Sequence, residues 1–192
     1  MTGTSLRHLP NLITVLRLIL VVPVCLALLQ GQYPLALGLF FVAGASDALD
    51  GFLARTFGWF SRFGAIADPL ADKLLLVLTF VTLTYVDELP LWLTVTVLGR
   101  DLIILVGALT YHWCLGPYQM QPTLLGKLST FTQITYVLVV ICNLAGIAMP
   151  DWSLAQGQWL VAFVAFLSGL HYTVLWGHRF FRGLRQRRRE DM

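Results

Sequence analysis

The fold of this chain is decided by residues 44–72, which read GASDALDGFLARTFGWFSRFGAIADPLAD. Four aspartates stand there in apolar surroundings: Asp47, Asp50, Asp68 and Asp72. A charged side chain at the centre of a membrane helix costs about 2.5 to 3.5 kcal/mol on insertion scales, so four carboxylates in such helices require compensation. The nature of that compensation is the main question that the sequence raises.

The rest of the chain is strongly apolar. Of its 192 residues, 57% are hydrophobic and 12% charged, whereas about 25% are charged in a soluble domain. This composition argues against a disordered chain and a soluble enzyme. Crossing a bilayer takes about 20 mostly apolar residues. Runs of about that length occur at Leu12–Leu29, Tyr33–Thr56, Ile66–Tyr85, Leu89–Thr110, Leu124–Ala145 and Leu154–Trp176.

These runs predict an all-α integral membrane protein. We expect a bundle of six transmembrane helices that forms a single domain over residues 1–192, with a polar active-site cavity at the cytoplasmic side. Arg17 interrupts the first run, so we interpret that run as a retained span and not as a cleaved signal peptide. Cys25, Cys114 and Cys142 are far apart and form no C-x-x-C pair, which favours neither a disulfide framework nor a zinc site. The sequence contains no nucleic-acid-binding motif.

The distribution of basic residues predicts the orientation. The connectors at residues 30–32, 86–88 and 146–154 contain no Lys or Arg, whereas Arg7, Arg62 and the carboxyl tail mark the other side. The positive-inside rule therefore places both termini and the active site in the cytoplasm, and we expect a bacterial inner (plasma) membrane. Six of the 13 basic residues lie between Arg179 and Arg189. We interpret residues 179–192 as a basic cytoplasmic tail, which serves as a topology signal and could also contact anionic headgroups.

The spacing of the aspartates brings their carboxylates together in pairs. Asp47 and Asp50 are three residues apart and Asp68 and Asp72 four apart, so each pair lies on one helix face. A short glycine-containing turn joins the two helices, which favours antiparallel neighbours. Four converging carboxylates repel one another unless cations neutralise them. An all-oxygen site suits Mg²⁺, Mn²⁺ or Ca²⁺ better than zinc or copper.

Ordinary ion pairing is the alternative explanation of these charges. For Asp101, which directly follows Arg100, pairing explains the charge as well as a functional role does. For the four clustered aspartates it is insufficient, because two nearby bases cannot neutralise four acids. The basic residues available for such pairs are Arg55, Lys73, Arg100 and Lys127.

Small residues surround the first aspartate pair. Gly51 and Ala54 lie on or beside its helix face, and Arg55 follows directly. Small residues permit close helix packing, but they also let a ligand approach the backbone. Packing alone does not require an arginine, whose planar guanidinium suits phosphate. We therefore favour a ligand site. A divalent-cation transporter is a non-enzyme alternative, but it gives no reason for this arginine.

The complete pattern is Asp47-x2-Asp50-Gly51-x2-Ala54-Arg55-x8-Gly64-x3-Asp68-x3-Asp72. It resembles the signature of the CDP-alcohol phosphatidyltransferases, which move a phosphatidyl group from CDP-diacylglycerol to an alcohol and release CMP. The resemblance implies that Asp47, Asp50, Asp68 and Asp72 bind two Mg²⁺ or Mn²⁺ ions and that Asp72 is also the general base. It further implies a homodimer, and a CDP-diacylglycerol site formed by Asp47, Gly51, Ala54, Arg55 and Gly64.

Weaker similarities concern the acceptor. Arg100-Asp101 and the stretch from Pro122 to Thr130 are similar to cardiolipin synthases of the CMP-forming, eukaryotic type, for which the acceptor is phosphatidylglycerol. Glycerol 3-phosphate, the acceptor of phosphatidylglycerophosphate synthases, is the alternative. Polar residues on three different spans are candidates for holding the acceptor phosphate: Asn11, Thr14, Arg17, Arg100 and Lys127.

Overall fold

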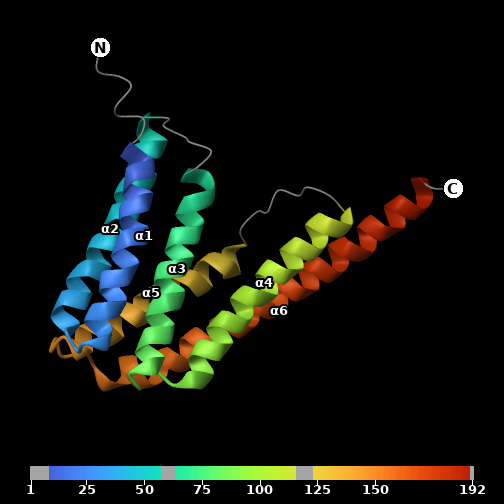
Figure 1. Ribbon diagram of the computed structural model, residues 1–192. Helices are drawn as coiled ribbons and strands as arrows, with labels where there is room; N and C mark the ends of the chain where they lie inside the picture. Colours follow the sequence, from blue (N-terminus) through green and yellow to red (C-terminus); the bar gives the residue numbers. More distant parts are fainter. Residues whose placement is uncertain (1–8, 58–63, 116–122, 191–192) are drawn as a thin grey trace, which may run out of the picture. The chain divides into compact units, whose positions relative to one another are not determined.

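The computed structural model describes residues 9–57, 64–115 and 123–190, and the side chains of residues 15–46, 71–110, 113 and 123–177. These residues form helices and no strand, which confirms the predicted all-α class (Figure 1). The helices are α1 (Leu9–Leu29), α2 (Tyr33–Phe57), α3 (Gly64–Tyr85), α4 (Leu91–Leu115), α5 (Leu124–Leu144) and α6 (Asp151–Glu190).

Each predicted apolar run corresponds to one helix. The largest difference is at the end of the chain, where α6 continues past Trp176 to Glu190 and includes the basic tail. The apolar pattern could not predict this extension, because residues 178–190 are mainly polar and charged. Arginine and glutamine are good helix formers, so the helix continues after its apolar part ends.

The described side chains are distributed as a bilayer environment requires. Large apolar side chains are exposed on every helix, among them Phe41, Phe131 and Phe166, each about two-thirds exposed. Several polar side chains are buried, including Arg17 and Gln133 at 0% exposure. This is the reverse of a water-soluble protein, in which charged side chains are almost never fully buried. Exposed apolar side chains together with buried polar ones fit helices that are surrounded by the hydrocarbon of a bilayer.

Three helical segments in the described part of the chain are long and apolar enough to cross a membrane: Leu91–Thr110, Leu124–Leu144 and Asp151–Gly177. Two further apolar helical segments are shorter, Val15–Leu29 and Tyr33–Ser46. The protein is therefore a membrane protein by the character of its helices. That all six helices span the bilayer stays a prediction.

The three connectors that lack Lys and Arg begin with the same tight turn. A residue with positive φ follows each helix: Gly31 (69°) after α1, Asp87 (62°) after α3 and Gly146 (86°) after α5. After α1, for example, the amide of Gln32 donates to the carbonyl of Ala27 (2.8 Å). This is the Schellman arrangement, which satisfies the last helix carbonyls. Glycine adopts this conformation without strain, whereas Asp87 does so as a non-glycine residue.

The helices form two compact units. One contains α1, α2, α3 and residues 137–150, and within it α1 packs against both α2 and α3. The other contains residues 90–136 and α6, and within it α4 packs along α6 (Figure 1). These two helices run parallel, because their contacts keep a nearly constant sequence offset: Trp92 stacks on Trp159, Arg100 bonds Ser168, and Gly107 faces Trp176.

Candidate active site

The regular helices α2 and α3 carry the predicted acidic cluster. Asp47 and Asp50 lie near the end of α2, and Asp68 and Asp72 near the start of α3. Both pairs therefore have the helical spacing that the sequence predicted. The side chains of residues 47–70 lie outside the described residues, so the convergence of Asp47, Asp50 and Asp68 stays a prediction. The same applies to the predicted nucleotide-binding residues Gly51, Ala54, Arg55 and Gly64.

Asp72, whose side chain is described, has a basic partner on another helix. Nη1 of Arg17 in α1 donates to Oδ1 of Asp72 in α3 at 2.5 Å. The arginine side chain is 1% exposed and the aspartate side chain 45% exposed. Asp72 is thus held from the protein side while part of its surface stays accessible. The Coulomb attraction of Asp72 explains how a cation can be buried inside an apolar helix.

This pair was not predicted from the sequence, in which Arg17 is a candidate acceptor residue and other basic residues are the candidate ion-pair partners of the aspartates. Arg17 and Asp72 are 55 residues apart, so no local spacing indicates their contact. The available signal was Arg17 itself, which lies five residues into an apolar run and needs an acidic partner on a neighbouring helix.

The donor chemistry of the predicted cluster fits a divalent cation. All four candidate ligands are carboxylates, which are the ligands that Mg²⁺ and Mn²⁺ prefer. The 45% exposure of the Asp72 side chain leaves room for a ligand beside it. Among the side chains that the structure describes, no group of three or more acidic, histidine or cysteine residues forms a site, but three of the four predicted ligands lie outside that set.

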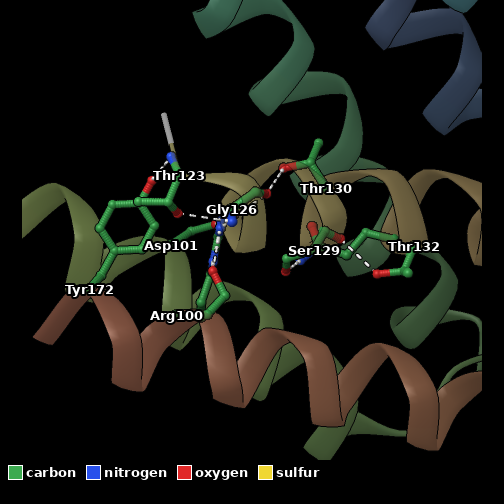
Figure 2. Close-up of polar contacts among 10 residues, drawn as sticks. Arg100, Asp101, Thr123, Gly126, Ser129, Thr130, Thr132 and Tyr172 are labelled. Atoms are coloured by element: carbon green, nitrogen blue, oxygen red, sulfur yellow. Dashed lines mark hydrogen bonds and ion pairs between the residues drawn. The ribbon is translucent and has the colours of Figure 1, made fainter. Parts of the chain in front are cut away.

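Arg100 is at the centre of a second polar cluster (Figure 2). It is 6% exposed and lies in α4. Its Nε and Nη2 donate to Oγ of Ser168 in α6 (3.2 and 2.8 Å), and Nη1 donates to Oδ1 of Asp101 (2.6 Å). Nη2 also donates to the carbonyl of Gly126 in α5 (3.4 Å). Arg100 therefore connects three helices, and each of its guanidinium nitrogens is engaged within the chain.

The same cluster fixes the first turn of α5. Oγ1 of Thr123 accepts a hydrogen bond from the amide of Gly126 (3.1 Å), which is an N-cap. The amide of Thr123 donates to the hydroxyl of Tyr172 in α6 (3.3 Å), and the ring of Tyr172 lies 5.9 Å from Cζ of Arg100. A Cβ at position 126 would lie 2.9 Å from the Tyr172 hydroxyl. A side chain at position 126 would therefore require the Tyr172 hydroxyl to shift.

Lys127 follows Gly126 in this turn, and its side chain is exposed. Arg100 and Lys127 are two of the predicted acceptor residues, and the structure places Arg100 close to the turn that carries Lys127. Ser168 and Tyr172, which complete the cluster, were not predicted, because their sequence positions give no sign of a contact with Arg100. Arg100 forms an ion pair with Asp101, which is one of the two explanations that the sequence left open for this aspartate. The side chains of Asn11 and Thr14 lie outside the described residues, although α1 covers both positions.

The apolar helices, the aspartate spacing and the buried arginines together describe a membrane protein with two pairs of aspartates on two consecutive helices. The family model of the CDP-alcohol phosphatidyltransferases matches residues 7–173. The chain belongs to this family, which confirms the resemblance inferred from the aspartate signature.

Curated relatives have three different names. The chain is 31% identical to the CMP-forming cardiolipin synthase of Rattus norvegicus over 169 residues, which cover 79% of this chain and 54% of that protein. It is 33% identical to the CDP-diacylglycerol–glycerol-3-phosphate 3-phosphatidyltransferase of Rickettsia typhi over 176 residues, which cover 87% of this chain and 96% of that protein. A probable phosphatidylglycerophosphate synthase of Mycobacterium tuberculosis is 32% identical over 155 residues, 73% of this chain and 69% of that protein. The chain spans about half the length of the animal cardiolipin synthases that it matches.

Proposed function

We propose that this protein transfers a phosphatidyl group from CDP-diacylglycerol to an alcohol and releases CMP. The observation that carries the proposal is the family match over residues 7–173, which includes every position of the eight-residue aspartate signature. The burial of Arg17 against Asp72 supports the proposal. Ionisable residues inside membrane helices are costly and usually mark functional sites.

In the proposed reaction, Asp72 is the general base. The acceptor hydroxyl oxygen attacks the phosphorus that carries diacylglycerol, the anhydride bond to CMP breaks, and the hydroxyl proton passes to the Asp72 carboxylate. Arg17 is a positioning residue in this scheme, because it fixes the carboxylate on which the proton is received. Gly51, Ala54, Arg55 and Gly64 would hold the nucleotide and its phosphates, with Arg55 as the bidentate donor.

Asp47, Asp50, Asp68 and Asp72 would hold two Mg²⁺ or Mn²⁺ ions. When bound, these divalent ions would neutralise negative charge on the phosphoryl oxygens and on the oxygen of the leaving CMP. The oxygen-only donor set supports this proposal, and it also favours these ions over zinc. We expect excess chelator to abolish CMP release and Mg²⁺ or Mn²⁺ to restore it. Full turnover in chelator would contradict the metal assignment.

For the acceptor we propose phosphatidylglycerol, so that the product is cardiolipin. The Arg100–Asp101 pair supports this choice, because Asp101 offsets part of the arginine charge. The singly charged phosphodiester of phosphatidylglycerol needs less positive charge than the phosphate monoester of glycerol 3-phosphate. The names of several relatives agree with this choice.

Phosphatidylglycerophosphate synthesis is the second candidate. The observation in its favour is the relative from Rickettsia typhi, of which this chain covers 96%. Purified protein in mixed micelles, supplied with CDP-diacylglycerol and one acceptor at a time, distinguishes the two by the CMP released. We expect phosphatidylglycerol to support turnover. Turnover with glycerol 3-phosphate alone would assign the second function.

The proposed setting is a bacterial inner membrane, with both termini and the active site on the cytoplasmic side. The absence of Lys and Arg from the three Schellman-turn connectors supports this orientation. The connectors at residues 30–32 and 86–88 lie at the same end of their unit, which is supported by the hydrogen bond from the Tyr33 hydroxyl to Glu88 (3.4 Å). We also propose a homodimer, in keeping with the family resemblance, and no nucleic-acid partner.

A further inference from the structure

An open apolar groove lies between α4 and α6. Its volume is about 370 Å³, and α4 contributes side chains that are about half exposed, such as Leu102, Ile103 and Val106. One end is marked by Trp176, whose ring packs directly over Gly107. A Cβ on that glycine would lie 3.2 Å from Cδ1 of the ring. The absence of a side chain at position 107 therefore lets the indole form part of the groove wall. The lining residues are Leu102, Ile103, Val106, Gly107, Thr173 and Trp176.

The helix that forms one wall is longer than a bilayer requires. α6 has 40 residues, which span roughly 60 Å at 1.5 Å per residue, against about 30 Å of hydrocarbon. Its apolar span ends at Gly177, one residue after Trp176. Tryptophan at a span end is typical of the headgroup level. The groove therefore lies within the hydrocarbon and ends near the headgroup region.

The charge beyond this point is entirely of one sign over eleven residues. From Arg179 to Arg189 the sequence has six arginines and no acidic residue, and Arg179 follows Trp176 by three residues on the same helix. Anionic lipid surfaces attract such residues by about 1 kcal/mol each, which is about a fivefold preference per residue. This basic run has no part in the proposed reaction.

We propose that the α4–α6 groove and the basic end of α6 form a binding site for one anionic glycerophospholipid. The groove takes an acyl chain, Trp176 lies at the level of the glycerol, and the arginine-rich stretch supplies charge for the phosphate. The charge complementarity selects an anionic lipid over a zwitterionic one, which an apolar groove alone cannot do. The proposal is independent of the transferase reaction, so a catalytically inactive Asp72→Asn protein should bind the lipid equally well.

The test uses quenching of Trp176 fluorescence by lipids with brominated acyl chains. The full-length protein is placed in bilayers that contain either brominated phosphatidylglycerol or brominated phosphatidylcholine, each over the same series of mole fractions. The Trp176 signal is the difference between the wild type and Trp176→Phe. We expect half-maximal quenching at a concentration at least about fivefold lower for the anionic lipid. Replacing Arg179 and Arg182, two of the six arginines of the basic run, by Gln should reduce that difference.

Two neighbouring substitutions separate the groove from the general lipid surface. Val106→Phe fills the groove and should abolish the selective quenching. Leu105→Phe is the matched control, because Leu105 is similarly exposed on α4 but does not line the groove, and it should leave the quenching unchanged. Equal quenching by both lipids would overturn the proposal. Absence of Trp176 quenching by either lipid would also overturn it, because a second copy of the chain or another partner would then cover the groove.

Discussion

Arg17 of α1 and Asp72 of α3 form an ion pair in which the arginine is fully buried and the aspartate is about half exposed. This asymmetry determines what each residue can do. The arginine has little access to a substrate, whereas the carboxylate has both a fixed partner and an accessible side. Arg17 is therefore better suited to orient Asp72 than to contact the acceptor phosphate itself.

The first prediction follows from that asymmetry. We expect Arg17→Gln to lower kcat by about 100-fold, because a misplaced catalytic group costs about that much, and to leave the KM values of both substrates nearly unchanged. Arg17→Lys keeps the charge and should recover part of the rate. CMP release at varied concentrations of each substrate measures these constants. A rise in acceptor KM without loss of kcat would return Arg17 to the acceptor site.

The second prediction concerns a close helix contact in the unit that contains α6. A Cβ at Gly157 would lie 2.7 Å from the ring of Tyr136 in α5. We expect Gly157→Ala to destabilise the protein by about 1 to 3 kcal/mol through overpacking. The unfolding midpoint in detergent measures this effect. In a Tyr136→Ala background the cost should disappear, because the clashing ring is gone.

Gly99→Ala is the matched control for this substitution. Gly99 is also helical, but a Cβ there would meet nothing within 4 Å. Alanine should therefore stabilise α4 by about 0.5 to 1 kcal/mol. Equal effects of the two substitutions would mean that the contact between Gly157 and Tyr136 does not limit the packing of α5 on α6.

The fold was predicted from the sequence more completely than the site. Apolar length sets the helix positions, so each predicted run matches a helix, and the turn at Gly31 follows from the conformational freedom of glycine. The contacts of Arg17 with Asp72 and of Arg100 with Ser168 join residues 55 and 68 positions apart. Such pairs depend on which helix faces pack together, and apolar periodicity leaves that undetermined where all faces are hydrophobic.

The third prediction tests the orientation of the chain. Single cysteines at positions 62 and 187 should react with a membrane-impermeant thiol reagent only from the cytoplasmic side, and one at position 88 only from the opposite side. The test is best made in a background without Cys25, Cys114 and Cys142, of which Cys25 and Cys142 are free thiols in the structure. Labelling of position 62 from outside would invert the proposed topology.

The final prediction concerns Arg100 and the acceptor. Because each guanidinium nitrogen of Arg100 is bonded within the chain, we expect this residue to act by fixing the first turn of α5, on which Lys127 is exposed. Arg100→Gln should then raise the acceptor KM, leave that of CDP-diacylglycerol nearly unchanged, and lower stability by about 1.5 to 3 kcal/mol through lost charged hydrogen bonds.

Two further variants separate positioning from direct contact. Ser168→Ala removes the shared acceptor of two Arg100 hydrogen bonds, so it should reproduce part of both effects of Arg100→Gln. Lys127→Gln should raise the acceptor KM with little loss of stability, because an exposed side chain contributes little to folding. The measurements are CMP release with phosphatidylglycerol and the unfolding midpoint. If Ser168→Ala lowers stability but leaves the acceptor KM at the wild-type value, the cluster supports only the fold, and the acceptor phosphate must be held by other residues.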